Sequence, residues 1–164
     1  MCDLHGLLIR LAEARFPFVV VGGYAAFAHG VSLVTQDLDV CCPFTAASLH
    51  QLELALGSLN PVHRMRPDRM RLEMPPGVHE GLRNLYLDTD WGPLDLLSDV
   101  KGIGDYSKVL SMSMEAEIGS QTVRLLSLEG ILRAKEAMDR PRDAEAARQL
   151  RAIQQSLASS PLPK

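Results

Sequence analysis

The sequence predicts an α+β fold with α/β character, in which a mixed β-sheet is flanked by helices. Short runs of β-branched residues and leucine alternate along the chain with segments whose leucines recur at helical spacing. The chain has 164 residues, of which 46% are hydrophobic and 23% are charged. This length suits one domain with a packed core, and this composition excludes wholesale disorder, collagen-like repetition and coiled-coil architecture.

The first half of the chain predicts three helices and two strands, in the order 4–15 (helix), 18–21 (strand), 24–29 (helix), 37–41 (strand) and 46–59 (helix). Asp3 can cap the first helix, and Pro17 stops it before a continuous apolar run that is typical of a buried strand. Gly22-Gly23 breaks that strand, and an Ala-rich helix follows. The second strand shows period-two alternation, and the third helix carries leucines on one face.

The second half predicts four strands, over residues 82–87, 94–97, 115–118 and 121–125, and two helices, over residues 128–138 and 141–156. Residues 60–74 alternate around Pro67-Asp68, which is a hairpin signal. Ser127 can cap the helix over 128–138, and Pro141 suits the first turn of the helix over 141–156.

We expect these elements to form a single domain over residues 1–158. Its core is expected over about residues 16–126, its C-terminal helices over about 127–156, and a flexible tail over 159–164. Residues 98–112 show no consistent period, so no element is predicted there.

Charge and cysteine content restrict the partners and the compartment. The net charge is −3, so any contact with nucleic acid must come from a local patch. The longest apolar run, residues 16–28, is too short to cross a membrane, and the N-terminus lacks the pattern of a secretory signal. Three cysteines without a C-x-x-C spacing fit a reducing compartment, so we expect a cytoplasmic protein.

Gly22-Gly23 is a candidate phosphate-binding turn between a buried strand and a helix. Glycine lets a ligand approach the backbone, and the free N–H groups at a helix N-terminus attract an anion. The alternative is that the two glycines make a tight turn and nothing more.

Three aspartates are candidate metal ligands. Asp37 and Asp39 lie two residues apart on a predicted strand, so their carboxylates point to one face. Asp95 lies between core-facing leucines and points away from them. If the two strands are neighbours, the carboxylates converge and repel one another unless cations such as Mg²⁺ fill the cluster. Two ions about 3.5–4 Å apart would then clamp an in-line phosphoryl transfer; the alternative is separate solvent-facing acids.

In this order, the motifs resemble those of the minimal nucleotidyltransferases of the DNA polymerase β-like superfamily. That family carries a Gly-Gly or Gly-Ser turn after its first strand, an Asp-x-Asp on the next strand and a third Asp on a later one. The matching segments are Val21-Gly22-Gly23-Tyr24-Ala25, Thr35-Gln36-Asp37-Leu38-Asp39 and Leu94-Asp95-Leu96-Leu97. Residues 128–135 and Asp139-Arg140-Pro141-Arg142-Asp143 look like the Lys-containing helix and Gly-Arg-Pro-Lys-Asp segment of the branch that includes AbiEii-type toxins.

The resemblance covers about residues 16–152 and implies a nucleotidyltransferase-like core with C-terminal helices. It implies transfer of a nucleoside monophosphate from an NTP to an acceptor hydroxyl, with Gly22 and Gly23 holding the triphosphate. It further implies that Asp37, Asp39 and Asp95 bind two Mg²⁺ or Mn²⁺ ions, and that Asp95 helps to deprotonate the acceptor. Lys135 would reach the triphosphate or lie near the base; the alternative is a solvated charge on a helix face.

Departures from the family pattern concern the triphosphate. Gly23 stands where many members have Ser, and Leu33 stands where this branch often has Arg. Asp139 and Arg142 replace the more usual Gly and Lys. No carboxylate is lost, so the resemblance implies an intact metal site with weaker triphosphate binding.

Four arginines within eight residues, Arg64, Arg66, Arg69 and Arg71, are candidate contacts to an acceptor or a phosphate. A two-residue turn at Pro67-Asp68 would pair Arg66 with Arg69 and Arg64 with Arg71, which places all four guanidinium groups on one face. Opposed like charges are destabilising, so a phosphate or a carboxylate is expected there. The alternative is a solvated loop whose charges are screened by nearby acids.

The expected partners are an NTP and an acceptor that the sequence does not identify. A tRNA or another RNA, a protein and an antibiotic-like molecule all fit, and the acceptor site requires the arginine segment, the C-terminal helices, a second copy of the chain or a partner. Two alternatives stay open: a non-catalytic or toxin–antitoxin-type relative with an antitoxin-like partner, and a plain ligand-binding domain. Carboxylates of Asp37 and Asp95 separated by more than about 10 Å would favour the latter.

Overall fold

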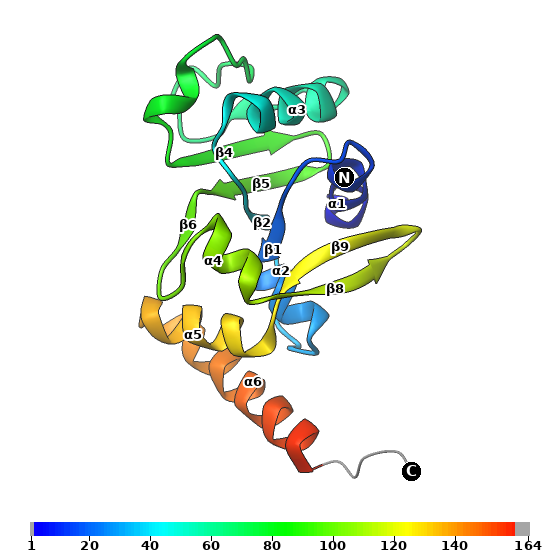
Figure 1. The fold of residues 1–164 in the computed structure, drawn as a ribbon, viewed down its shortest axis with the longest axis vertical. Coiled ribbons are helices and arrows are strands. Elements are labelled where there is room, and N and C mark those ends of the chain that lie inside the picture. The colour runs from blue at the N-terminus through cyan, green and yellow to red at the C-terminus, as the bar shows by residue number, and fades with distance from the viewer. Residues whose placement is uncertain (1, 160–164) are drawn as a thin grey trace.

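The computed structural model describes residues 2–159, which form one seven-stranded mixed sheet with helices packed around it (Figure 1). The strands of this sheet are β1 (Val19–Val21), β2 (Leu38–Cys41), β3 (Val62–His63), β4 (Asn84–Thr89), β5 (Gly92–Leu97), β8 (Ser113–Ile118) and β9 (Gln121–Leu126). The helices are α1 (Leu4–Glu13), α2 (Gly22–Ala28), α3 (Ala46–Leu56), α4 (Tyr106–Ser111), α5 (Leu128–Met138) and α6 (Pro141–Ser159). The α+β class expected from the sequence is confirmed.

The sheet order is β3-β4-β5-β2-β1-β9-β8, which places β2 at the centre. β2 runs parallel to β5 and antiparallel to β1, and β1 runs parallel to β9. All three residues of β1 are buried, as expected of a strand covered on both faces. In β2, Leu38 and Val40 are fully buried whereas Asp39 between them is partly exposed, so the alternation predicted from the sequence fixes the direction of the acid.

Short elements fill the stretches between the longer strands and helices. Residues 98–112, for which the sequence predicts no element, contain the short pair β6 (Asp99–Val100) and β7 (Gly104–Asp105) followed by α4. The region predicted as a hairpin, residues 60–74, folds back on itself through an antiparallel bridge between Val62 and Arg71 and a turn in which the Arg69 N–H donates to the Arg66 carbonyl oxygen. Its strand β3 also pairs with β4. The 3-10 turns η1 (Gly57–Leu59) and η2 (Val78–Gly81) complete the irregular stretches.

The C-terminal helices start where Ser127 and Pro141 predict. The Ser127 side chain accepts a hydrogen bond from the Gly130 N–H at the start of α5, and Asp139 ends that helix with a left-handed φ of 50°. Pro141 opens α6, which continues to Ser159, beyond the expected residue 156. The rest of the expected flexible tail, 160–164, lies outside the described residues.

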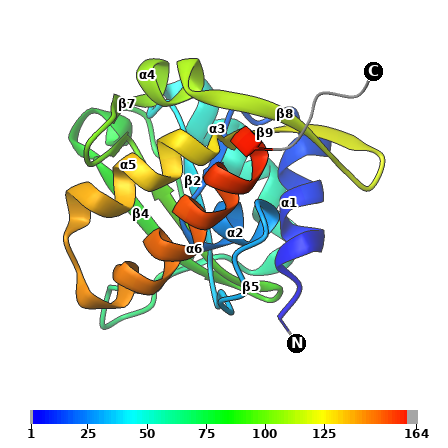
Figure 2. The same ribbon diagram turned by 90° about the horizontal axis from the view of Figure 1, so that it is seen from below.

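The two C-terminal helices lie together at one end of the molecule, and α6 extends away from the sheet (Figure 1). The view from that end shows both helices crossing in front of the strands (Figure 2). None of the helices within residues 2–159 combines the length and the apolar character that a membrane span requires.

Candidate metal centre

Asp37, Asp39 and Asp95 converge at the middle of the sheet. Asp37 directly precedes β2, Asp39 lies within β2, and parallel pairing places Asp39 opposite Asp95 of β5. One carboxylate oxygen from each residue lies within 4.8 Å of the others. This separation is within reach of one or two shared cations and far below the roughly 10 Å that would have favoured separate surface acids. The sequence predicted this convergence on the condition that the strands were neighbours, and they are.

The glycine turn holds the central carboxylate of the cluster. β1 pairs with β2 so that Val21 faces Asp39, and the next residue, Gly22, begins α2 with a left-handed φ of +64°. A Cβ atom on Gly22 would lie 2.3 Å from Oδ2 of Asp39, so the carboxylate occupies the space of a side chain. The Gly23 N–H also donates a hydrogen bond to Asp39. The helix therefore begins at Gly22, two residues earlier than predicted, because the turn wraps around this acid.

The cluster is short of positive charge. Burial, followed by repulsion from Asp37 and Asp95, raises the pKa of Asp39 to about 7 although Arg64 and the Gly23 hydrogen bond lower it. Burial also raises the pKa of Asp95, against the hydrogen bond and charge of Arg64. Three carboxylate oxygens this close together are a hard donor set suited to Mg²⁺ or Mn²⁺, so these residues fit the metals that the resemblance implies.

Arg64 is the cation that faces this cluster. Its Nη2 forms an ion pair with Oδ1 of Asp95, and its Nη1 lies 3.9 Å from Oδ1 of Asp88. Its guanidinium carbon lies 5.8 Å from the ring centroid of Tyr86, the residue that faces Asp95 across the β4–β5 pair. Sequence reasoning singled out Arg64 as an acceptor contact but did not predict its pairing with Asp95.

Arg66 and Arg71 do not join Arg64 on a common face, so the expected face of four guanidinium groups is wrong; Arg69 meets Arg64 at Asp88. Arg71 faces Val62 instead of Arg64, and its guanidinium donates to the backbone oxygen of Gly57 at 2.7 Å. Arg66 pairs with its neighbour Asp68 at 2.9 Å, and Arg69 pairs with Asp88 at 2.6 Å. The register differs because β3 follows the edge of β4 and a tight turn joins Arg66 to Arg69.

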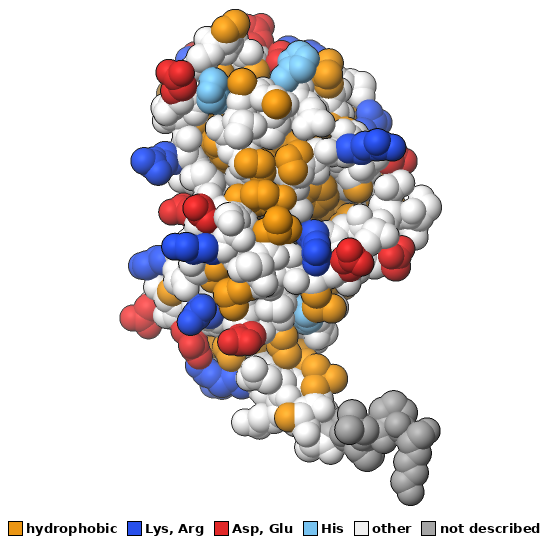
Figure 3. Space-filling model, in the orientation of Figure 1, with side chains coloured by type: hydrophobic (Ala, Val, Ile, Leu, Met, Phe, Trp, Pro, Cys, Tyr) orange, Lys and Arg blue, Asp and Glu red, His pale blue; other side chains and the backbone are white. Residues whose placement is uncertain are grey.

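Charges of both signs are also mixed over the surface. On the face shown in Figure 3, Lys and Arg side chains are interspersed with Asp and Glu, and hydrophobic side chains gather near the middle. This face therefore offers no broad basic patch of the kind that nucleic-acid binding requires.

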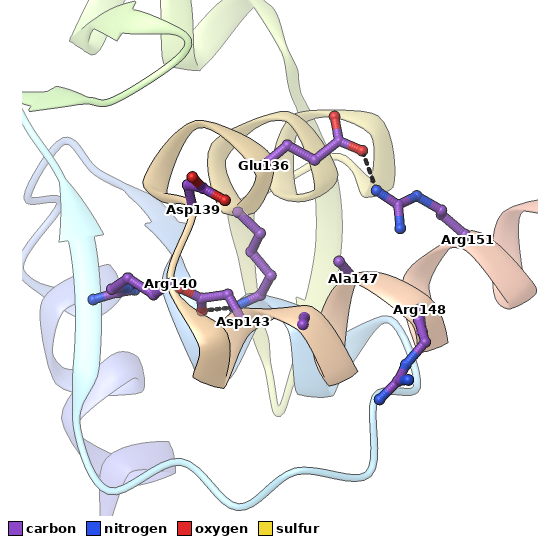
Figure 4. Close-up of a pocket in the computed structure, with 9 residues that line it drawn as sticks. Glu136, Asp139, Arg140, Asp143, Ala147, Arg148 and Arg151 are labelled. Carbon is purple, nitrogen blue, oxygen red and sulfur yellow. Dashed lines mark hydrogen bonds and ion pairs between the residues drawn. The ribbon is translucent and has the colours of Figure 1, made fainter.

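A second buried carboxylate, Asp143, joins α5 to α6. It is 6% exposed and accepts from Lys135 Nζ at 3.1 Å and from Arg140 Nε at 2.6 Å. Burial opposes ionisation of Asp143, but these two cations outweigh it and lower its pKa. A cavity of about 320 Å³ adjoins Asp143 between the two helices, and Glu136 and Arg151 form a further ion pair there at 2.6 Å. Figure 4 shows the residues that line this cavity. The amine of Lys135, predicted to contact the nucleotide, thus forms an ion pair with Asp143.

The chain shares its fold with solved nucleotidyltransferases at low sequence identity. The lincosamide antibiotic adenylyltransferase LnuA, solved with lincomycin bound, superimposes with a TM-score of 0.61 at 14% identity, over 92% of this chain and 95% of LnuA. ANT(2")-Ia, solved with adenylyl-2"-tobramycin, gives 0.54 at 19% identity over 95% of each chain. An antigenic nucleotidyltransferase-like protein from Paracoccidioides brasiliensis gives 0.55 at 19% identity, over 91% of this chain and 72% of that protein.

No protein-family model and no curated protein sequence matches the chain. The structural likenesses confirm the expected nucleotidyltransferase-like fold. The activity is inferred from the residues of the site.

Proposed function

We propose that this chain is a metal-dependent nucleotidyltransferase. The observation that carries the proposal is the convergence of Asp37, Asp39 and Asp95 within 4.8 Å, beside a glycine turn and on a fold shared with nucleotidyltransferases. In the reaction, the acceptor oxygen bonds to the α-phosphorus of an NTP as the bond from that phosphorus to the bridging oxygen breaks, which releases pyrophosphate.

The chain's own residues supply binding and proton transfer in this proposal. Bound Mg²⁺ or Mn²⁺, two ions with the NTP, would neutralise the carboxylates and the developing charge on the phosphate oxygens. Asp37 and Asp39 would hold the metal, and Asp95 would bind it and accept the proton of the acceptor hydroxyl. Gly22 and Gly23 would admit the triphosphate to the backbone beside Asp39. Lys135 would have to leave Asp143 to reach the nucleotide.

We further propose a small hydroxylated molecule as the acceptor, with RNA as the competing outcome. LnuA and ANT(2")-Ia, which share the fold, were solved with lincomycin and with adenylyl-2"-tobramycin. Arg66 and Arg69 are neutralised by carboxylates, Arg71 donates to uncharged oxygens, and the chain carries a net charge of −3. These charges favour an acceptor smaller and less anionic than RNA.

We propose that the chain is similar to the AbiEii-like branch of this superfamily. The proposal rests on Lys135 and Asp143, which belong to the two segments that resemble that branch, residues 128–135 and 139–143. An antitoxin-like partner, a homo-oligomer and a cytoplasmic location stay predictions.

The test incubates the full chain with each α-labelled NTP, Mg²⁺ or Mn²⁺, and either total tRNA or a panel of hydroxylated antibiotics. Label on a small acceptor together with release of pyrophosphate is the expected result, and the Asp37→Asn variant should give neither. Asp68→Asn is the matched control, because Asp68 is an exposed acid outside the cluster. Label on RNA would overturn the choice of acceptor. Failure to bind NTP at millimolar metal would overturn the enzymatic proposal and favour a non-catalytic relative.

A further inference from the structure

Arg64 occupies one of the carboxylates that a metal ion would need. We propose that Arg64 is a resident counterion of the aspartate cluster, that a divalent cation displaces its guanidinium from Asp95, and that Asp88 then takes it over. The proposal rests on the metal-dependent function above and adds the step that controls entry of the metal.

The backbone around Arg64 is fixed, so only its side chain has to move. The Arg64 N–H donates to the Tyr86 carbonyl oxygen at 2.9 Å, and Tyr86 faces Asp95 on the neighbouring strand. The guanidinium reaches Asp95 across Tyr86 while the Arg64 side chain keeps 25% of its surface exposed. A flexible side chain on an anchored backbone can exchange between two carboxylates without a change of fold.

The charges around Asp95 favour the exchange. Three carboxylates lie together and Arg64 forms an ion pair with one of them, Asp95, which leaves an excess of negative charge for a further cation. A divalent ion concentrates twice the charge of a guanidinium at a point, and oxygen ligands bind it at short range. Both cations need the oxygens of Asp95, and they repel each other there, so metal binding is expected to drive Arg64 away.

Asp88 is placed to receive the displaced guanidinium. Its Oδ1 lies 3.9 Å from Arg64 Nη1, and its Oδ2 already binds Arg69 at 2.6 Å. The two oxygens therefore face different arginines, so Asp88 can hold both at once. Its side chain is 29% exposed, so water can solvate the carboxylate while the guanidinium moves.

The test measures Mn²⁺ binding to the full chain by electron paramagnetic resonance, without nucleotide, at pH 8.5. Arg64→Gln removes the competitor and should tighten Mn²⁺ binding about tenfold, because the cluster then faces the metal alone. Asp88→Asn removes the receiving carboxylate and should weaken binding about threefold. Arg66→Gln is the matched control: it removes a cation that pairs with the exposed Asp68, outside the cluster, and its affinity should stay within about twofold of the wild type.

Unchanged or weaker Mn²⁺ binding by Arg64→Gln would overturn the proposal while leaving the metal site intact, provided that Asp37→Asn abolishes binding. If neither the wild type nor Arg64→Gln binds Mn²⁺, the metal site itself fails and the proposal fails with it. A second measurement uses the wild type alone, in case the variant does not fold. Diamagnetic Mg²⁺ should shift the side-chain ¹⁵N resonance of Arg64 but not that of Arg66, and a stationary Arg64 resonance would overturn the exchange.

Discussion

The molecule contains two carboxylate clusters with opposite charge balance: the sheet cluster of Asp37, Asp39 and Asp95, and the helix cluster around the buried Asp143. At the centre of the sheet, Asp37, Asp39 and Asp95 share one arginine, and the pKa values of Asp39 and Asp95 are raised. Between α5 and α6, Asp143 alone receives two cations, and its pKa is lowered. The charges of the second cluster are balanced without a ligand, whereas the first cluster would be stabilised by a cation from solution.

This difference separates a structural ion cluster from a candidate reaction centre. Removing the carboxylate from the helix cluster leaves two cations without their counterion, so stability should fall. Removing a carboxylate from the sheet cluster relieves repulsion, so stability should hold or rise while function is lost. The following substitutions test whether the two clusters differ in this way.

The largest expected effect is the loss of nucleotide transfer in Asp39→Asn. We expect a fall of at least about a thousandfold, since several kcal/mol of charge stabilisation depends on the metal that Asp39 would hold. The thermal midpoint of the metal-free variant should match or exceed that of the wild type. Retention of wild-type transfer would show that the sheet cluster is not the reaction centre.

Asp143→Asn should produce the largest loss of stability. A neutral amide cannot compensate Lys135 and Arg140, so the free energy of unfolding, measured by urea denaturation, should fall by about 3 kcal/mol. Glu145→Gln is the matched control on the same helix. It breaks a pair with Arg148 in which both side chains are largely exposed, and it should change stability by less than about 1 kcal/mol. If the two substitutions lowered the free energy of unfolding equally, the helix cluster would have no special structural role.

The two clusters should also give stability opposite dependences on pH. The pKa of Asp39 is about 7 in the folded chain and lies near 4 in the unfolded chain, so the folded state holds the proton longer. Stability should therefore fall as pH rises between about 4 and 7, by about 2–3 kcal/mol from pH 5 to pH 8 in EDTA. Asp143 acts in the other direction, and its contribution should be lost only as pH falls below about 4.

Urea denaturation at pH 5 and pH 8 measures this slope. Asp39→Asn should flatten it, and saturating Mg²⁺ should flatten it in the wild type because the metal replaces the proton. A slope of the same size in Asp39→Asn would assign the effect to other groups.

The smallest expected effect concerns the backbone of the sheet cluster. Gly22→Ala should cost about 2 kcal/mol, because the residue has a left-handed φ and its Cβ would displace Asp39. Gly77→Ala is the control that measures the cost of the positive φ alone. Gly77 also has a positive φ, but nothing lies within 4 Å of its Cβ position. It should cost about 1 kcal/mol and leave Mn²⁺ affinity unchanged, whereas Gly22→Ala should weaken it.

Those parts of the site that depend on local patterns could be predicted from the sequence. The period-two alternation around Asp39 and the leucines beside Asp95 determine which face each acid takes, and Ser127 and Asp139 determine the ends of α5. In each case the physical cause lies within a few residues of the feature it fixes, so no knowledge of distant pairing is needed.

The pairing of Arg64 with Asp95 could not be predicted, because it depends on contacts distant in sequence. β3 aligns with β4 through Val62 and Asp88, and this alignment carries Arg64 to the sheet cluster against the register that the local turn suggested. Residues 98–112 escaped prediction for a different reason: β6, β7 and α4 are each too short for a hydrophobic period to emerge.

The contact between Gly22 and Asp39 has a consequence for how this chain can diverge over evolution. The carboxylate of Asp39 fills the place where any side chain at residue 22 would begin. The two positions should therefore change together: relatives that retain the acid should retain the glycine, and relatives that lose the acid meet only the cost of the left-handed φ when they gain a side chain. A set of homologues in which glycine disappears while the acid persists would show that the turn adopts another conformation in those proteins.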